Sequence, residues 1–184
     1  MKQSEYTTST GRKIYVFREV YDYAHQLNLL KWALKQSFKF NPGNEELLLT
    51  SKSEMILSSN PSIGPDMCRE MLRIDTLDSV RDVLGKRNLT RHWINADISK
   101  ASTHFHADAF SEGCLSLLYY LNCKWDVSWD GYTVWATDDL KDVEHMEYPE
   151  PGKLVIFDSL IPHKPMAAAV SSPSFRYTMN TVWK

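Results

Sequence analysis

Apolar and polar positions follow different patterns in the two halves of the chain. Residues 14–19 predict a short opening strand, and residues 20–38 carry apolar side chains at three- and four-residue steps, which predicts a helix. Two shorter helices are predicted at residues 66–73 and 76–86, where acidic or hydroxyl side chains can cap the first turn. Residues 45–58 fit a helix or a strand. The first half is therefore expected to contribute mainly helices.

From residue 89 onward the apolar segments become short, rich in β-branched and aromatic residues, and separated by turn signals. Asp130-Gly131 and Pro151-Gly152 are two of these turns. The expected strands are residues 90–97, 102–107, 114–121, 132–137, 153–158, 165–170 and 175–183. The second half is therefore expected to form a strand-rich barrel or sandwich.

The length of 184 residues fits one domain with a substantial core, and neither an internal repeat nor a linker divides the chain. We therefore expect a single domain over residues 1–184, in which residues 1–88 give helical support to a barrel core of residues 89–184. The formal net charge of −2 disfavours non-specific binding to nucleic acids.

The cysteine pattern and the N-terminal segment bear on the cellular compartment. The 3 cysteines lack a disulfide-like spacing, which indicates reduced thiols and an intracellular protein. The first thirteen residues are polar, and no apolar run approaches the roughly 18 residues that are needed to span a bilayer. We expect a cytoplasmic protein that does not bind membranes.

The segment HFHAD at residues 104–108 is the first candidate for metal chemistry. It lies at the end of an expected strand, where ligands can converge on the mouth of a barrel. His104, His106 and Asp108 share one face of an extended chain, because side chains alternate. The two-residue offset favours His106 as the partner of Asp108. We expect His104 to be a partly buried histidine, or one that supports a ligand.

A second histidine must come from elsewhere in the chain. His163 follows the apolar run LVIFDSLIP and precedes Lys164-Pro165, which places it at a strand end. His145 lies in the charged segment DVEHMEYPE, which we interpret as a solvent-facing loop. We therefore favour His163 as the distal ligand and expect His25 and His92 to be ordinary histidines.

Two imidazoles and one carboxylate form the facial triad of non-haem Fe(II) oxygenases, which leaves three metal positions open. The single carboxylate brings the charge of the site down to about +1, and the open positions can take a bidentate keto acid and then dioxygen. An all-histidine site would instead favour zinc or copper. The cysteines show no metal-ligand spacing, which argues against a closed thiolate site.

Arg176, in the expected strand FRYTMNTVW, is the candidate anion ligand. A buried guanidinium is unfavourable unless it is paired, and an external dicarboxylate would pair it through a bidentate contact. The alternative is a surface arginine on the outer face. Tyr120 is a candidate second donor to the same carboxylate, and the alternative for Tyr120 is a core tyrosine.

Taken in order, these segments resemble the Fe(II)/2-oxoglutarate-dependent oxygenases of the prolyl hydroxylase type, over roughly residues 90–184. HFHAD is similar to the family's His-x-Asp element, and SLLYYLNCKW followed by Asp130-Gly131 is similar to its tyrosine strand and glycine turn. PEPGKLVIFDSLIPH resembles the strand that ends in the distal histidine, and FRYTMNTVW resembles the arginine strand.

The resemblance implies a double-stranded β-helix (a jelly-roll or cupin-like barrel), mainly β with N-terminal helices packed outside. It implies Fe(II) bound by His106, Asp108 and His163, and 2-oxoglutarate bound by Arg176 and Tyr120. It also implies dioxygen as a co-substrate, ascorbate as a candidate reductant, and the reaction of a dioxygenase that hydroxylates its substrate.

The chain departs from this pattern at Gly131-Tyr132, where the family often has two glycines, and at Arg176, where many collagen-type members have lysine. Residues 1–88 carry no family motif, so the substrate stays open between a protein or peptide, as in peptidyl-proline hydroxylation, and a small molecule. Two other functions remain: a catalytically silent barrel that acts as a binding protein, and a cupin-type metal dioxygenase that uses no keto acid.

Overall fold

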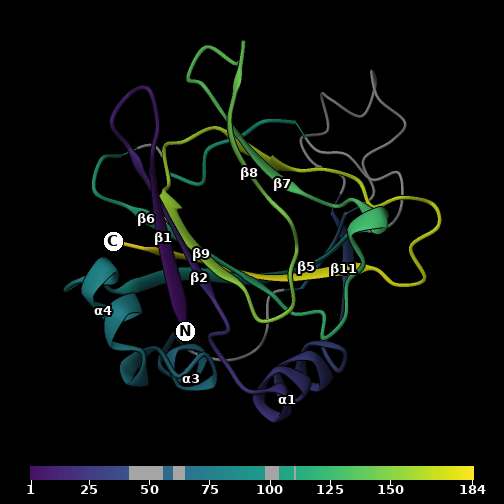
Figure 1. Cartoon of the computed structure of the whole chain (residues 1–184). Helices are drawn as coiled ribbons and strands as arrows, with labels where there is room; N and C mark the ends of the chain where they lie inside the picture. Colours follow the sequence, from purple (N-terminus) through teal and green to yellow (C-terminus); the bar gives the residue numbers. More distant parts are fainter. Residues whose placement is uncertain (42–55, 60–64, 98–103, 110) are drawn as a thin grey trace.

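Two β-sheets face each other in the computed structural model of the chain, and α-helices cover the outer side of the larger sheet (Figure 1). The structure describes residues 1–41, 56–59, 65–97, 104–109 and 111–184. The larger sheet consists, in spatial order, of β1 (Lys2–Thr7), β2 (Lys13–Arg18), β9 (Leu154–Asp158), β6 (Leu115–Tyr120), β11 (Arg176–Trp183), β5 (Leu89–Asp97), β4 (Ile56–Ser59) and β3 (Lys39–Asn41). The smaller sheet consists of β10 (His163–Pro165), β7 (Thr133–Ala136) and β8 (Val143–Glu147).

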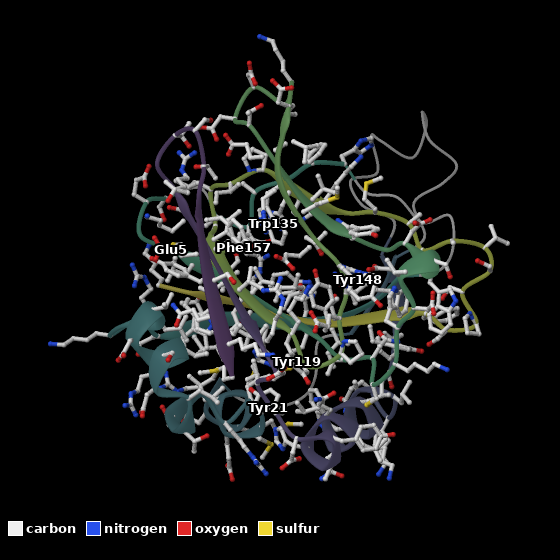
Figure 2. The ribbon with its side chains drawn as sticks, viewed as in Figure 1. Glu5, Tyr21, Tyr119, Trp135, Tyr148 and Phe157 are labelled. Atoms are coloured by element: carbon white, nitrogen blue, oxygen red, sulfur yellow. The ribbon has the colours of Figure 1, made fainter. Side chains whose placement is uncertain are left out.

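The central strands of the larger sheet are buried on both faces, which explains their continuous apolar runs. Side chains alternate across each strand, so Tyr119 and Ile156 face the helices, while Val155 and Phe157 face the smaller sheet. Figure 2 shows the two levels: Trp135 contacts Phe157 between the sheets, and Tyr21 contacts Tyr119 on the helix side. The space between the sheets is therefore where a site can be enclosed.

The helices pack on the outer face of the larger sheet. They are α1 (Tyr23–Ala33), α3 (Pro65–Met71) and α4 (Asp78–Leu84), accompanied by the short 3₁₀ turn η1 (Ile74–Thr76). A second 3₁₀ turn, η2 (Val127–Trp129), precedes β7. Asp22 caps α1 by accepting a hydrogen bond from the backbone N–H of His25 at 2.7 Å. No helix in the described part of the chain is long and apolar enough to cross a membrane.

The predicted fold class, mainly β with N-terminal helices, is confirmed. Several element boundaries are wrong. The helix predicted over residues 20–38 ends at Ala33, and Lys39 already begins β3. The helix predicted over 76–86 begins at Asp78 after the η1 turn, without a side-chain cap. The strand predicted over 165–170 is replaced by β10, which ends at Pro165. Residues 45–55 lie outside the described residues.

The N-terminal half contributes strands as well as helices, because β1, β2, β3 and β4 all belong to the larger sheet. The sequence KQSEYT of β1 is polar and mostly exposed, so it carries no apolar signal. It forms an edge strand that pairs with β2 alone. The exposed edge explains why the pattern of apolar positions does not reveal this strand.

Candidate active site

His106, Asp108 and His163 come together between the two sheets. His106 and His163 form an isolated antiparallel bridge, and their backbones exchange hydrogen bonds of 3.0 and 2.9 Å. The backbone N–H of Asp108 donates to the carbonyl of Ser159 at 2.9 Å. Because these bonds involve only the main chain, they hold residues 104–108 beside β10 whatever side chains the segment carries.

The three side chains converge on one point. One ligand atom from each lies within 4.8 Å of the others. The Oδ2 atom of Asp108 is 3.6 Å from Nε2 of His163, and its Oδ1 atom is 4.0 Å from Nε2 of His106. The side chains of Asp108 and His163 are buried, whereas that of His106 is 47% exposed. The cluster is therefore open to solvent on the His106 side.

Hydrogen bonds at Nδ1 orient both imidazole rings. His106 Nδ1 lies 3.1 Å from the carbonyl of His104, and His163 Nδ1 lies 3.0 Å from the carbonyl of Ile161. A carbonyl only accepts, so each Nδ1 carries a proton, and in the neutral ring each Nε2 keeps its lone pair. Burial lowers the pKa of His163, against the opposing effect of Asp108, and so favours this neutral form.

Serine hydroxyls hold the carboxylate of Asp108. The hydroxyl of Ser116 donates to Oδ2 of Asp108 at 2.6 Å and lies 2.9 Å from the hydroxyl of Ser159. On the open side, the guanidinium of Arg91 stacks over the Trp93 ring at 4.6 Å and reaches within 4.0 Å of Asp108 Oδ1. The carboxylate of Asp108 is thus oriented by the neutral hydroxyl of Ser116, which Ser159 contacts in turn, and it faces the exposed guanidinium of Arg91.

Arg176 projects into the space between the sheets and is 2% exposed. Its Nη1 donates to Oδ2 of Asp97 at 2.5 Å, and its Nη2 donates to Oγ1 of Thr133 at 2.5 Å. Thr133 also accepts a hydrogen bond of 2.8 Å from the hydroxyl of Tyr120. Burial raises the pKa of Tyr120 to about 12, so its hydroxyl stays protonated. Residues of β5, β6, β7 and β11 therefore form one buried polar group.

Gly131 leaves room for the Arg176 side chain. A Cβ at this position would lie 3.1 Å from the Trp125 ring and 3.3 Å from Cδ of Arg176. The φ angle of Gly131 is +77°, a conformation that side chains with a Cβ rarely adopt. The turn at residues 130–131 thus needs glycine for both backbone and space.

A family model described as the 2OG-Fe(II) oxygenase superfamily matches residues 92–183. The chain belongs to this superfamily. Fe(II) and 2-oxoglutarate are the metal and co-substrate typical of the family, so the chain is an enzyme of the oxygenase class. No curated protein matches the oxygenase in sequence.

Solved structures share the fold of this oxygenase. A Pseudomonas putida prolyl-4-hydroxylase matches with a TM-score of 0.65 at 20% identity, covering 92% of this chain and 90% of that chain. A prolyl hydroxylase from Trichoplax adhaerens, in complex with a hypoxia inducible factor peptide fragment, matches with a TM-score of 0.61 at 19% identity, covering 92% and 82%. HygX from Streptomyces hygroscopicus, with nickel and 2-oxoglutarate bound, matches with a TM-score of 0.66 at 12% identity, covering 96% and 83%. These likenesses confirm the double-stranded β-helix.

The donor set of the oxygenase fits a divalent iron. Two neutral imidazoles with free Nε2 atoms and one carboxylate supply three ligands, which suits Fe(II) and leaves positions for other ligands. The buried guanidinium of Arg176, with Tyr120 and Thr133 beside it, suits an acidic co-substrate. One contact in this group is not predicted from the sequence: Arg176 forms an ion pair with the carboxylate of Asp97.

Several expectations about single residues need correction. His104 is exposed rather than partly buried, and its carbonyl supports His106. His145 is not in a solvent-facing loop, because it lies on β8 with its side chain 14% exposed and bonds to Glu147 at 3.0 Å. Arg176 lies on the inner face, which excludes the surface alternative. No sequence pattern indicates four further residues that contact the site, namely Asp97, Ser116, Thr133 and Ser159.

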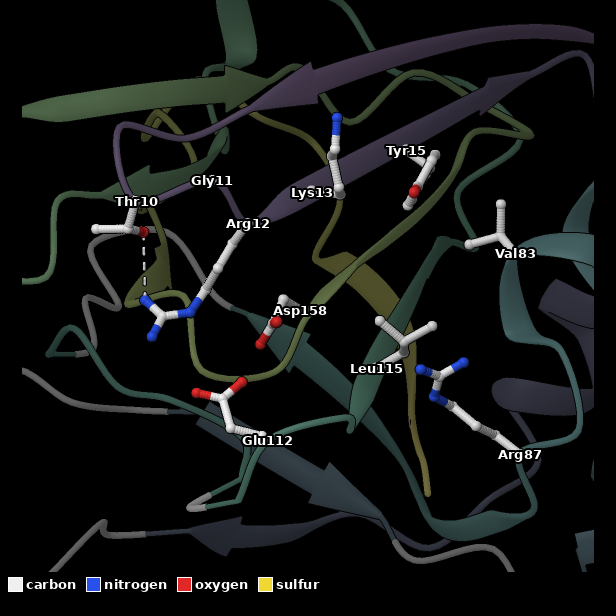
Figure 3. Close-up of a pocket in the computed structure, with 10 residues that line it drawn as sticks. All are labelled: Thr10, Gly11, Arg12, Lys13, Tyr15, Val83, Arg87, Glu112, Leu115 and Asp158. Carbon is white, nitrogen blue, oxygen red and sulfur yellow. Dashed lines mark hydrogen bonds between the residues drawn. The ribbon is translucent and has the colours of Figure 1, made fainter.

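A separate cavity of about 430 Å³ lies at the ends of β2 and β6 (Figure 3). Its charged lining is mixed, with Arg12, Lys13 and Arg87 opposite Glu112 and Asp158. The three cations are already engaged by the side chains of Asp138 and Glu5 and by the carbonyl of Gly113, respectively. None of the residues of the His-Asp-His cluster lines this cavity, so it does not belong to the oxygenase site.

Proposed function

We propose that this oxygenase is an Fe(II)- and 2-oxoglutarate-dependent hydroxylase in which His106, Asp108 and His163 hold the metal. The observation that carries the proposal is the convergence of two Nε2 lone pairs and one carboxylate within 4.8 Å. Arg176, assisted by Tyr120 and Thr133, binds the distal carboxylate of 2-oxoglutarate. When bound, Fe(II) and 2-oxoglutarate supply the oxidation chemistry: oxygen is consumed, 2-oxoglutarate becomes succinate and carbon dioxide, and a C–H bond is hydroxylated.

The residues of the chain orient the reactants and limit the access of water. The carbonyls of His104 and Ile161 keep the protons of both rings at Nδ1, and the Ser116 hydroxyl fixes Asp108 Oδ2. Arg176 is buried between the sheets, where it would hold the distal carboxylate of the co-substrate away from solvent. His106, which is half exposed, marks the side from which substrate enters.

We infer that the substrate is a peptide. The Trichoplax adhaerens prolyl hydroxylase, which shares the fold, is in complex with a peptide. The side chain that accepts the hydroxyl is then a peptidyl proline or another amino-acid residue, bound against the open His106 side. We also infer that residues 1–184 act as one oxygenase domain, because the helices of the first half pack on the barrel sheet.

The decisive experiment measures succinate formed by Fe(II)-loaded protein from 2-oxoglutarate, with ascorbate and with and without a proline-containing peptide library. We expect slow succinate formation without peptide and hydroxylated peptide, heavier by one oxygen atom, when a substrate is present. His106→Ala should abolish succinate formation. His104→Ala is the matched control and should retain it, because the supporting group of His104 is its carbonyl.

Two results would contradict the proposal. Equal succinate formation by wild type and His106→Ala would remove His106 from the metal site. Metal binding without any consumption of 2-oxoglutarate would favour the silent barrel or the cupin-type dioxygenase instead.

A further inference from the structure

The buried polar group around Arg176, which is the proposed binding site of the co-substrate, contains a carboxylate of the protein itself. Asp97 on β5 pairs in register with Arg176 on β11, and their side chains are 3% and 2% exposed. The Oδ2 atom of Asp97 accepts from Nη1 of Arg176 at 2.5 Å. Within the described part of the chain, Oδ1 of Asp97 and Nε of Arg176 are buried without a hydrogen-bond partner. The pair is therefore buried, but its hydrogen-bonding capacity is not used up.

The charge of this pocket is balanced before a ligand arrives. Arg176 and the ionised Asp97 together carry no net charge, and the neighbouring Thr133 and Tyr120 are neutral. Burial raises the pKa of Asp97, and the charge of Arg176 and its hydrogen bond oppose that rise. The next charged group, Glu147, is compensated by Lys153 and Arg18. A second carboxylate placed on the same guanidinium would approach a neutral pair, and it would be repelled by Asp97 in surroundings of low dielectric constant.

We propose that Asp97 is a specificity-determining residue that weakens the preference of the pocket for a keto acid with a charged distal group. The guanidinium fork has five N–H donors, so Arg176 can still bind a ligand through Nε and the second hydrogens of Nη1 and Nη2. The energy gained from a distal carboxylate is reduced by the carboxylate already present. This inference rests on the proposed function, in which Arg176 binds the distal end of the keto acid.

The test combines one substitution with two ligands. Asp97→Asn keeps the size of the side chain and an oxygen that accepts from Nη1, but it removes the charge. The ligands are 2-oxoglutarate and 2-oxopentanoate, which has the same carbon chain without the distal carboxylate. Equilibrium binding to Mn(II)-loaded protein is measured by calorimetry, without turnover. Asp138→Asn is the matched control, because it removes a carboxylate paired with an arginine outside the pocket.

We expect Asp97→Asn to bind 2-oxoglutarate about tenfold more tightly or better, with 2-oxopentanoate binding unchanged within about threefold. Asp138→Asn should leave both affinities as in wild type. In wild type, the preference for 2-oxoglutarate over 2-oxopentanoate should stay below about a hundredfold. This last measurement needs no variant, so it holds even if Asp97→Asn fails to fold.

Three outcomes would overturn the inference. They are a wild-type preference of about a hundredfold or more, an unchanged or weaker 2-oxoglutarate affinity in Asp97→Asn, and parallel changes for both ligands. In each of these cases the keto acids still bind, so the proposed function survives. Failure of wild type to bind either keto acid would overturn both.

Discussion

The imidazoles of His106 and His163 are oriented by backbone carbonyls two positions earlier in the chain, those of His104 and Ile161. Such a bond depends on local backbone conformation and not on the identity of the earlier side chain. Asp108 differs, because its orientation depends on the hydroxyl of Ser116 on another strand. The histidines are thus set by local structure, and the carboxylate is set by the fold.

At Gly131, the positive φ angle of the backbone and the closeness of the Arg176 side chain both disfavour a residue with a Cβ atom. We expect Gly131→Ala to destabilise the protein by about 1–3 kcal/mol and to weaken 2-oxoglutarate binding, because the new methyl group contacts the Trp125 ring and Cδ of Arg176. Urea unfolding gives the first quantity, and calorimetry on Mn(II)-loaded protein gives the second.

Gly11→Ala separates the two causes of this effect. Gly11 has a φ angle of +82°, but nothing lies within 4 Å of an added Cβ. It should therefore show the conformational cost alone and leave 2-oxoglutarate binding unchanged. Equal effects of the two substitutions on stability and binding would argue that Gly131 does not shape the pocket.

At the scale of elements, pairing between strands decides which side chains meet. The distal His163 could be predicted because it follows an apolar run, and the His-x-Asp segment could be predicted from its residue types and their two-residue spacing. Asp97 and Thr133 could not, since their contacts with Arg176 depend on the register of β5 with β11 and on the packing of β7 opposite. The sequence of a strand alone determines neither its register with a neighbouring strand nor its packing against the opposite sheet. The sequence of the half-exposed β8 predicts a loop because β8 is an edge strand of the smaller sheet.

A buried ion-pair network connects β8 to β2 and to the start of β9. Lys153 Nζ donates to Glu147 at 2.6 Å and to the carbonyl of Tyr148 at 2.7 Å, and Arg18 lies 3.1 Å from Glu147. Tyr148 is labelled in Figure 2. Glu147→Gln would leave Lys153 buried with a weaker partner, so we expect a loss of about 3 kcal/mol in unfolding free energy at neutral pH.

The loss should depend on pH in a defined direction. Burial alone would raise the pKa of Glu147, but hydrogen bonds from His145 and Lys153 and the nearby positive charges hold it below its ordinary value of 4.5. A carboxyl group with a lowered pKa stabilises the fold above the unfolded pKa, and this contribution disappears as pH falls through the folded pKa. The difference between wild type and Glu147→Gln, measured by urea unfolding, should therefore be complete at pH 7 and shrink progressively as the pH falls below 4.5 and through the lowered pKa of the folded state.

The matched control is Glu5→Gln on β1. Glu5 forms an ion pair of 2.6 Å with Lys13, but both side chains are more than 40% exposed. This substitution should leave the urea midpoint unchanged at both pH values. A destabilisation by Glu147→Gln that persists undiminished in acid would show that the charge of Glu147 is not its cause.

At the scale of the whole molecule, the site joins the two sheets. The smaller sheet supplies His163 and Thr133, and the larger sheet supplies Ser116, Arg176 and Asp97. One apolar cluster lies between the two sheets, and another lies between the larger sheet and the helices on its outer face. Because neither sheet holds the complete set, the site exists only when the two are packed against each other.

This arrangement predicts that metal binding stabilises the whole fold. A ligand at about 100 times its Kd adds about 2.7 kcal/mol to the native state, which for a chain of this size corresponds to a rise of roughly 5–10 °C in Tm. We expect this rise with Fe(II) under anaerobic conditions or with Mn(II), and its reversal by a chelator. Mg(II), which prefers oxygen ligands, should give a smaller shift. In His106→Ala the rise should disappear, whereas in His104→Ala it should persist, because only His106 contributes a ligand atom to the cluster. A rise of the same size in His106→Ala would show that the stabilising metal binds elsewhere.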